Sequence, residues 1–573
     1  MPSEARSAKS QPNVPDKRHA VSVLRRINSA YVLSVVSIVL VIVAALLVVY
    51  RLNPPPAAGV NAPLTEFSAE RALKHLTVIA QNPHPVGTSE HAAVASYIQN
   101  ELAALGLRPE IQQTPDATNI LVRLKGTTDE KAVALVCHYD SVPPSPGASD
   151  DGAAVVSILE TLRALKSSQP LRNDVIALFT DAEEVGMLGA VAFVYRHPWA
   201  KDVGVVLNFD ARGSSGPVLM FETSPKNGWL IKEFGKAAPH PTANSLSQAI
   251  YELMPNKTDF TIFKERGLVG LNFAHIVGRN YYHSSLDNLT NLDHRTLQHQ
   301  GSTALALTRH FGNLNLTSTA DHNGVYFDVL NSTLISYSEQ WVVPLAVVVF
   351  LIFVALVAFG FKNNHLTVNG LLISVTAVPL SVISTVVLLF PIKALLQMAV
   401  SSEENNLWMA LLIVITICVL LVVNGKLSRA VGVSNLMAGG YLWSLILLAL
   451  TSLFLKGGSY LFTWSFLFNL GALGFVLARK GREIFSIKHL MLLVLGAVPG
   501  IILFTPLIYL MWVALTLRSF VALFAIVGIT VLLLGPLTPH FAVVTALRKT
   551  FPGVLEGRKK ATDFKDGIRE IRG

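Results

Sequence analysis

The sequence has little charge for its length. Asp, Glu, Lys and Arg make up 14% of the 573 residues, whereas apolar residues make up 51%. This composition, with a mean hydropathy of +0.48, excludes a wholly water-soluble protein and indicates several membrane spans. A lipid bilayer is therefore the first partner that the sequence predicts.

Positive charge exceeds negative charge, with a formal net charge of +9. Such an excess occurs in nucleic-acid-binding proteins, but here the visible basic clusters stand beside apolar runs, at 25–26, 479–482 and 558–560. That placement is the positive-inside pattern of membrane proteins. We therefore expect no nucleic-acid partner.

The chain has only two cysteines, Cys137 and Cys418. Each lies in an apolar run, one typical of a strand and one typical of a membrane span, so a disulfide between them is not expected. Neither has a second thiol nearby to make a cysteine-based metal site. We expect both to be small buried apolar side chains.

Long apolar runs are what the sequence does have. The first, residues 31–50, is long enough to cross a bilayer and follows a polar, basic segment. The proline-rich stretch after it does not have the small residues of a signal-peptide cleavage site. We predict a cytoplasmic tail at 1–28 and an uncleaved signal anchor at 29–51. The next segment then faces the periplasm or an organelle lumen.

A second group of apolar runs forms a predicted all-α multi-span region at 339–543. It follows a linker at 316–338 and precedes a basic cytoplasmic tail at 544–573. In this topology the basic loops face the cytoplasm, and the loop with Glu403 and Glu404 faces the other side. The spans hold almost no ionisable residues, which argues against an ion or proton relay. We expect about seven spans, at 341–361, 367–392, 407–424, 433–455, 458–478, 489–516 and 519–540.

Between the two groups of spans, residues 60–315 have the pattern of a water-soluble α/β domain. Amphipathic helices, such as 90–106 and 151–167, alternate with apolar strands. This alternation predicts a mostly parallel, mixed sheet sandwiched by helices, with ligand sites at the carboxyl ends of its strands. The strands are expected at 119–126, 132–140, 174–181, 203–210, 217–223 and 268–276.

Side chains that can bind a metal follow several of these strands. Nitrogen and oxygen ligands without thiols suit a hydrolytic zinc centre, and a bridging carboxylate would suit two metals. One of two adjacent glutamates would face the metal, and the other could act as a general base. The candidates are His138, Asp140, Asp150, Asp151, Glu183, Glu184, Asp210 and His283.

Five short motifs, in this order along the chain, resemble those of the M28 family of metallopeptidases. The stretches NPHPVGTSEH, NKTDFTIFKERG and YYHSSLDN resemble the membrane-bound branch of that family, which includes vacuolar and endoplasmic-reticulum enzymes. The resemblance implies a zinc aminopeptidase-like fold for the domain. The motifs are HYD (138–140), GASDD (147–151), AEE (182–184), NFD (208–210) and YYHS (281–284).

The resemblance implies a two-zinc metallopeptidase in which Asp150 bridges the two Zn²⁺ ions. One ion would also be bound by His138 and Asp210, and the other by Glu184 and His283. The implied activity is that of a membrane-anchored aminopeptidase, an exopeptidase that hydrolyses peptides on the non-cytoplasmic side.

The resemblance also implies roles beside the metals. Glu183 would be the general base, and Asp140 would orient His138 by a hydrogen bond to its ring. A cis peptide bond is implied between Asp150 and Asp151.

Five further residues near the motifs have interpretations of their own. His275 could replace His283 as a ligand, although a core histidine is the simpler interpretation. Tyr282 could stabilise an oxyanion or serve only in packing, and Arg212 could bind a substrate carboxylate. Asp151 is expected to cap a helix or brace a loop, and Asp287 to brace the loop of His283.

Two other functions stay open from the sequence. One is a glutaminyl-cyclase-like zinc enzyme on the same fold, which the complete set of two-metal ligands disfavours. The other is a receptor or transporter with a catalytically silent ectodomain. Zinc content separates this second alternative from a peptidase. No oligomeric state is predicted.

Overall fold

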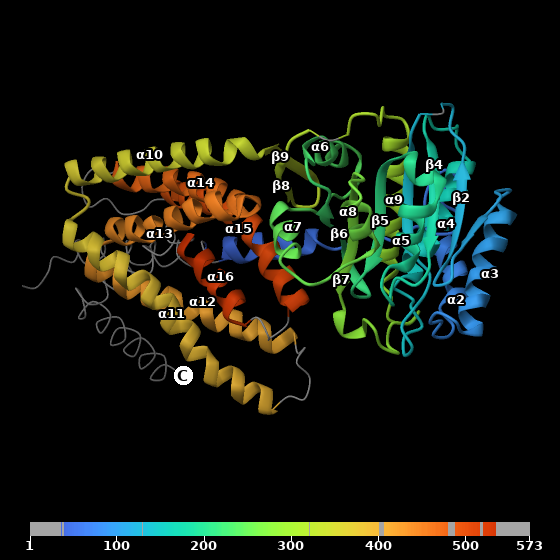
Figure 1. Ribbon diagram of the computed structural model, residues 1–573. Helices are drawn as coiled ribbons and strands as arrows, with labels where there is room; N and C mark the ends of the chain where they lie inside the picture. The colour runs from blue at the N-terminus through green and yellow to red at the C-terminus, as the bar shows by residue number, and fades with distance from the viewer. Residues whose placement is uncertain are drawn as a thin grey trace, which may run out of the picture.

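The computed structural model describes residues 36, 39–128, 130–319, 321–399, 406–478, 487–515 and 520–533. Figure 1 shows a sheet domain covered by helices at one end of the molecule and a bundle of long helices at the other. The predicted tails at 1–28 and 544–573, the loop with Glu403 and Glu404, and the basic residues 479–486 lie outside the described part.

The sheet domain is built on seven strands in the order β1-β2-β4-β3-β5-β7-β6. They are β1 Glu110–Gln113, β2 Thr118–Leu124, β3 Ala132–His138, β4 Asp174–Thr180, β5 Val203–Ala211, β6 Ser215–Thr223 and β7 Gly270–Val277. The four central strands β4, β3, β5 and β7 run parallel, and the pairings outside them are antiparallel. Every residue of β3 and β4 is buried, as in strands covered on both faces. The predicted mixed sheet is confirmed.

The strand β1 is absent from the sequence prediction. Its sequence, EIQQ, contains one apolar residue, Ile111, and that side chain is exposed at the sheet edge. A polar edge strand has no alternating apolar pattern by which it could be recognised.

Helices cover both faces of the sheet. Alternate residues of β3 face opposite sides: Val133 and Leu135 belong to one apolar cluster, and Ala134 and Val136 to another. The first cluster contains side chains of α2, α3, α4 and α9, and the second contains side chains of α5 and α8. The helices are α2 Ala69–Ile79, α3 Ser89–Ala104, α4 Gly152–Lys166, α5 Leu188–Arg196, α6 Gly228–Ala237, α7 Ser245–Tyr251, α8 Asp259–Glu265 and α9 His294–Gly312.

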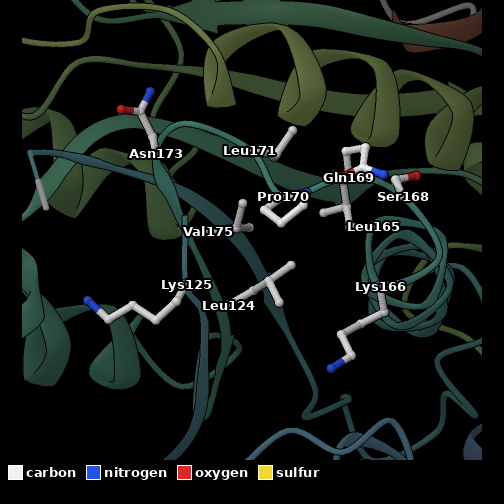
Figure 2. Close-up of a pocket in the computed structure, with 10 residues that line it drawn as sticks. All are labelled: Leu124, Lys125, Leu165, Lys166, Ser168, Gln169, Pro170, Leu171, Asn173 and Val175. Carbon is white, nitrogen blue, oxygen red and sulfur yellow. The ribbon is translucent and has the colours of Figure 1, made fainter. Parts of the chain in front are cut away.

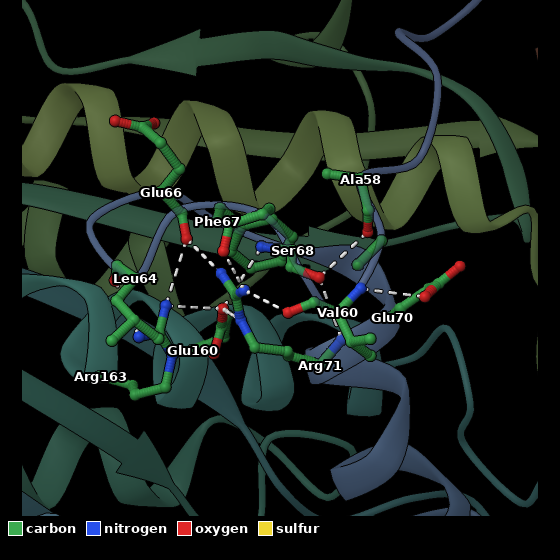
Figure 3. A network of polar contacts seen from close by, with 12 residues as sticks. Ala58, Val60, Leu64, Glu66, Phe67, Ser68, Glu70, Arg71, Glu160 and Arg163 are labelled. Carbon is green, nitrogen blue, oxygen red and sulfur yellow. Dashed lines mark hydrogen bonds and ion pairs between the residues drawn. The ribbon is translucent and has the colours of Figure 1, made fainter.

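A buried ion-pair network holds the segment that leads from the first helix to the sheet domain. Glu160 of α4 is buried and accepts hydrogen bonds from Arg71 at 2.7 Å and from Arg163 at 2.6 Å. The two guanidinium groups also donate to main-chain carbonyls of the segment, to Val60 at 2.9 Å and to Leu64 at 2.8 Å (Figure 3). Because two arginines compensate the buried charge of Glu160, the segment is fixed on α4.

The expected linker at 316–338 contains a β-hairpin. Its strands are β8 Gly324–Val329 and β9 Thr333–Ser338, which pair antiparallel. Phe327 of β8 is buried and its ring stacks on Tyr460 of the helical bundle, with centroids 4.8 Å apart. The segment is therefore an ordered part of the junction with the bundle rather than a plain connection.

The bundle contains six helices long and apolar enough to cross a membrane among the described residues. About seven were expected there; the seventh, at 519–540, is described only as α16 Phe520–Leu533, 14 residues or about 21 Å long. The described part of the first expected span is likewise short, at Val39–Arg51. The six are α10 Val342–Lys362, α11 Val368–Ala399, α12 Asn406–Val431, α13 Val433–Phe454, α14 Ser459–Leu477 and α15 Ile487–Leu515.

The sheet domain and the bundle share an apolar core. Leu246 of α7 and Phe327 of β8 belong to the same buried cluster as Phe462 of α14 and Phe504 of α15. The hydroxyl of Ser245 also donates to the main-chain carbonyl of the short turn η4 (Lys456–Gly458) between α13 and α14, at 2.7 Å. The two parts are thus packed together on the side of the bundle where α10 begins and α13 ends.

The two cysteines differ in environment. Both are unpaired, and Cys137 is buried in β3, as predicted. The prediction of burial is wrong for Cys418 on α12, which is exposed among the residues that the structure describes.

Candidate metal centre

The candidate ligands come from the carboxyl ends of neighbouring strands. His138 is the last residue of β3, Asp210 is next to last in β5, and Glu183 and Glu184 follow β4. Parallel strands that are neighbours in a sheet end at the same edge, so these side chains meet there. Two loops, before α4 and after β7, bring Asp150 and His283 to the same edge.

Asp150 lies at the centre of the cluster. Its Oδ1 is 3.2 Å from Nε2 of His138, and its Oδ2 is 3.1 Å from Nε2 of His283. Nε2 of His283 is also 3.0 Å from Oε1 of Glu184. One ligand atom from each of His138, Asp150 and Glu184 lies within 4.8 Å of the other two, a spacing suited to one shared cation.

The buried atoms of the cluster fit a cation. Oε1 of Glu184 and Nε2 of His283 are buried and form no hydrogen bond of acceptable geometry with any described residue, although they approach each other. Burial raises the pKa of Glu184, and it raises the pKa of Asp210 to about 7, with Asp150 nearby as the next cause. Grouped buried carboxylates are costly without positive charge, and imidazole with carboxylate is a donor set that zinc prefers.

Asp140 is placed differently from the expectation. Its main-chain oxygen lies 3.0 Å from Nδ1 of His138, whereas its carboxylate is 3.5 Å from that atom. The carboxylate instead accepts from the main-chain N–H groups of Glu183, at 3.1 Å, and Glu184, at 3.2 Å. Its side chain therefore positions the glutamate pair, while its main chain orients the histidine.

Two further aspartates connect the loops. Asp287 accepts from the N–H groups of Ser149, at 2.7 Å, and Asp150, at 3.1 Å, so it joins the loop of His283 to that of Asp150. Asp151 precedes α4 but makes no side-chain capping bond; its carboxylate accepts from the N–H of His138 at 3.3 Å. Asp151 therefore stands at the N-cap position of α4, as expected, but its side chain makes the bracing contact and not a capping bond. The implied cis peptide between Asp150 and Asp151 is present.

The backbone is strained beside the glutamates and at one histidine. Ala182 has φ 58° and His283 has φ 56°, both in the left-handed region that favours glycine. Such a conformation in other residues costs about 1–3 kcal/mol each and is common at functional sites. The turn at Ala182 directs the chain out of β4 just before Glu183 and Glu184.

Tyr282, Arg212 and His283 form a stack. The ring of Tyr282 lies on that of His283, with centroids 3.7 Å apart, and the guanidinium of Arg212 is 5.7 Å from the centre of the Tyr282 ring. Tyr282 and Arg212 both line the cavity described below.

Of the two histidines considered as a ligand, His283 makes the contact with Asp150 and Glu184. His275 is buried inside β7, where burial lowers its pKa to about 4 and keeps it neutral.

A cavity of about 470 Å³ adjoins the cluster. Asp150, Glu183, Glu184 and Asp210 line one part of it. The rest is mainly apolar, with side chains that include Leu219, Phe221, Ile250, Met254, Leu507 and Leu510.

A smaller cavity, of about 190 Å³, lies at the other end of the sheet. Leu124 and Val175, which pair where β4 begins, line it together with Lys125 and Lys166 (Figure 2). It is remote from the residues that follow β4, so we do not assign it to the site.

Sequence reasoning missed two groups of site residues. Asp259, at the start of α8, is fully buried and accepts a hydrogen bond from Thr180 at the end of β4; burial raises its pKa to about 6. Asp259 lies in the stretch NKTDFTIFKERG (256–267), and the resemblance of that stretch to the membrane-bound branch could have indicated it. The second group, Leu507, Leu510 and Met511 of α15, gave no such signal, because each reads as an ordinary residue of a membrane span.

Part of the chain is similar to known proteins. Residues 119–308 match Peptidase family M28. Mouse endoplasmic reticulum metallopeptidase 1 is 33% identical over 249 residues, which cover 41% of this chain and 28% of that protein. The vacuolar membrane protease of Candida tropicalis is 30% identical over 298 residues, 48% of this chain and 32% of that protein. The LapA aminopeptidase of Legionella pneumophila aligns with a TM-score of 0.38 at 17% identity, covering 44% of this chain and 74% of that one.

The family that matches this chain is a family of peptidases, and the match covers the sheet domain from β2 to α9, residues 119–308. More particularly, the chain is similar to an endoplasmic reticulum metallopeptidase and to a vacuolar membrane protease. The resemblance stated from the motifs is confirmed. The matched region spans less than a third of each of these two relatives.

Proposed function

We propose that this protein is a membrane-anchored two-zinc metallopeptidase that removes residues from the amino terminus of peptides. One observation carries the proposal: His138, Asp150, Glu184 and His283, which are far apart in the sequence, meet in one cluster with separations of 3.0–3.2 Å. The presence of every expected ligand residue favours this function over a silent ectodomain.

The two oxygens of Asp150 support its role as the bridging ligand. Oδ1 faces His138 and Oδ2 faces His283, so each oxygen can serve one of two ions. Asp210 would join His138 at the first ion, and Glu184 would join His283 at the second. When bound, two zinc ions supply Lewis acidity and lower the pKa of a bound water.

Glu183 is suited to act as the general base. Burial raises its pKa well above the ordinary value, despite the opposing charge of His138, so its carboxylate has a strong tendency to accept a proton. The bond from its N–H to Asp140 fixes its main chain. Glu183 takes a proton from the attacking water and then returns it to the amine of the leaving peptide.

The size of the cavity favours a terminal rather than an internal cleavage site. Sites for small molecules are roughly 300–1,000 Å³, and the cavity of about 470 Å³ falls in that range. It would hold the end of a peptide, whereas an endopeptidase needs a cleft open at both ends. Tyr282 and Arg212 line this cavity and are candidates to contact the scissile carbonyl and a substrate carboxylate.

The positions of basic residues support a non-cytoplasmic sheet domain. Lys362 ends α10, and Lys426 and Arg429 lie near the end of α12, all at the end of the bundle remote from the sheet domain. At the near end, Lys456 is paired with Glu339 at 2.7 Å. Unpaired positive charge favours the cytoplasm, so we place the sheet domain in the periplasm or a lumen, and the two terminal tails in the cytoplasm.

Metal analysis and a peptide-cleavage assay on the full chain in detergent test the proposal. We expect about two zinc ions per chain and stepwise release of amino-terminal residues, abolished by chelation and restored by zinc. Zinc content near zero would instead indicate a silent ectodomain. Conversion of amino-terminal glutamine to pyroglutamate without peptide cleavage would indicate a cyclase.

A further inference from the structure

We propose that the membrane helix α15 forms one wall of the substrate cavity, so that the multi-span region is part of the substrate-binding machinery. In this assignment Leu507, Leu510 and Met511 contact a bulky apolar side chain of the peptide residue being released. The inference rests on the proposed peptidase function and adds a role for the membrane region.

The lining of the cavity is the first observation. Leu507, Leu510 and Met511 border the same cavity as the metal-site carboxylates Glu184 and Asp210. Figure 1 shows the end of α15 close to the sheet domain and α7, and α15 is in contact with β7. The cavity therefore has a charged part at the strand ends and an apolar part closed by a helix that lies more than 200 residues further along the chain.

The length of α15 explains how a membrane helix reaches the site. The helix has 29 residues, or about 44 Å at 1.5 Å per residue, whereas the hydrocarbon core of a bilayer is about 30 Å thick. The helix must therefore extend out of the membrane core at one end or tilt within the core. The carboxyl end, where Leu507 and Leu510 lie, is the end that contacts the cavity.

The contact is held in place by close packing. Leu503 and Phe504, one turn before Leu507, belong to the apolar core that α15 shares with α7 and β8. Leu510 itself is only 8% exposed. Because α15 and α7 are joined through one core, the wall that they form has a defined position relative to the metal ligands.

The occupant is indicated by the chemistry of the α7 segment that lines the same cavity. Ile250 and Met254 line it and suit an apolar side chain. Between them, the hydroxyl of Tyr251 is buried and has no hydrogen-bond partner among the described residues. Ser247, Asn256 and Lys257 also line the cavity. The apolar side chains match that of an apolar peptide residue, whose main chain supplies a partner for the free hydroxyl.

A substitution that fills the cavity tests the proposal through selectivity. In the full-length protein, Leu510→Trp should lower the ratio of kcat/KM for a leucine substrate to that for an alanine substrate by about tenfold or more, since even one methylene in an apolar pocket changes kcat/KM by roughly 10–200-fold. The matched control is Leu495→Trp, on the same helix but 60% exposed, which should leave the ratio unchanged. Zinc content and thermal stability identify a variant that is merely misfolded. An unchanged ratio in folded Leu510→Trp would overturn the proposal.

Thiol protection supplies a measurement that does not require turnover. Met511→Cys is introduced with Glu183→Gln, which prevents cleavage, and with Cys418→Ser, which removes the exposed native thiol. A peptide with amino-terminal leucine should slow alkylation of the new thiol, and a peptide with amino-terminal glycine should slow it much less. Leu495→Cys in the same background should be alkylated equally with and without peptide.

The two measurements separate failure of this inference from failure of the proposed function. If the wild type cleaves no peptide but leucine peptides still protect the thiol, the peptidase proposal fails and the cavity wall stands. If the wild type cleaves peptides but neither selectivity nor protection changes, the role of α15 fails alone. Protection by a single-chain lipid and not by peptide would show that α15 faces acyl chains there, and would also overturn the inference.

Discussion

Glu183 and Glu184 are adjacent in the sequence but have different environments. Both N–H groups donate to the carboxylate of Asp140, which fixes the main chain of the pair. The side chain of Glu184 then contacts His283 at 3.0 Å, and the side chains of both glutamates line the cavity. The contact with His283 supports our proposal that Glu184 binds the metal and that Glu183 transfers the proton.

At this scale we predict that the same substitution, made at each of the two glutamates, has different effects on zinc binding. Glu183→Gln should lower turnover by about 10²–10⁴-fold, because general acid–base groups contribute that much, and should keep its zinc. Glu184→Gln should lose zinc affinity together with activity, because an amide is a poorer zinc ligand than a carboxylate. Peptide cleavage and metal analysis of the purified variants check both.

One result would contradict each of these two assignments. Near-wild-type turnover of Glu183→Gln would reject its role as the base. Equal zinc content in Glu184→Gln and the wild type would reject its role as a ligand.

At the scale of elements, the parallel strands bring several carboxylates to one edge of the sheet. Without zinc, burial raises the pKa of Glu183 and Glu184, and that of Asp210 to about 7. A carboxyl group with a raised folded-state pKa binds its proton more tightly in the folded state. It therefore stabilises the fold below that pKa, and the contribution is lost as pH rises through it.

His283 changes the stability of the zinc-free protein in the same direction. Burial lowers its pKa, but the close approach of the Asp150 and Glu184 carboxylates outweighs this and raises the pKa to about 10. Its stabilising contribution is complete below the unfolded value of about 6.5 and is lost as pH rises toward 10. The zinc-free protein should therefore be more stable at pH 6 than at pH 8.

Zinc binding has the opposite pH dependence, because protons compete with the metal for His138 and His283. We predict that chelation lowers Tm more at pH 8 than at pH 6. Thermal unfolding of the full chain with and without chelator at the two pH values measures this. An equal decrease at both pH values would contradict the assignment of these residues as ligands.

The β8–β9 hairpin is the element that joins the sheet domain to the bundle. Phe327→Ala should destabilise this junction by about 3–5 kcal/mol, the usual cost of removing a buried phenylalanine ring, because its ring is 4% exposed and stacks on Tyr460. The measurement is protease cleavage between 316 and 338. Ile335→Ala is the control, since Ile335 is 39% exposed; equal cleavage of the two variants would contradict a structural role for the hairpin.

At the scale of the whole molecule, the bundle has one end packed on the sheet domain and another with basic residues. We predict that a cysteine at the exposed position Ser96 reacts with a membrane-impermeant reagent in intact cells or vesicles. A cysteine at Ser3 should react only after permeabilisation. Both variants carry Cys418→Ser. Labelling of both positions from the same side would contradict the proposed topology.

Much of the sheet domain could be predicted because its signals are local. Strands β3 and β4 are buried along their whole length, so each is a continuous apolar run, and polar residues at the end of such a run are easy to notice. The edge strand β1 and the hairpin carry little such signal. The contacts of the Asp140 side chain carry little such signal too. Its spacing of two residues from His138 predicts that both side chains point to the same side of the strand. It does not predict the contact of Asp140 with the N–H groups of Glu183 and Glu184.

The sequence by itself determined the class of fold, the presence of membrane spans, and the set of residues from which the candidate centre is built. Hydrophobicity and hydrogen-bonding capacity are properties of single residues, so they leave a pattern in the sequence. Only the tertiary structure decided which partners those residues meet: Asp150 between His138 and His283, and Leu510 of α15 beside the metal-site cavity. An apolar residue in a membrane span has the same sequence signal whether it faces lipid, another helix or a substrate cavity, because all three are apolar surroundings.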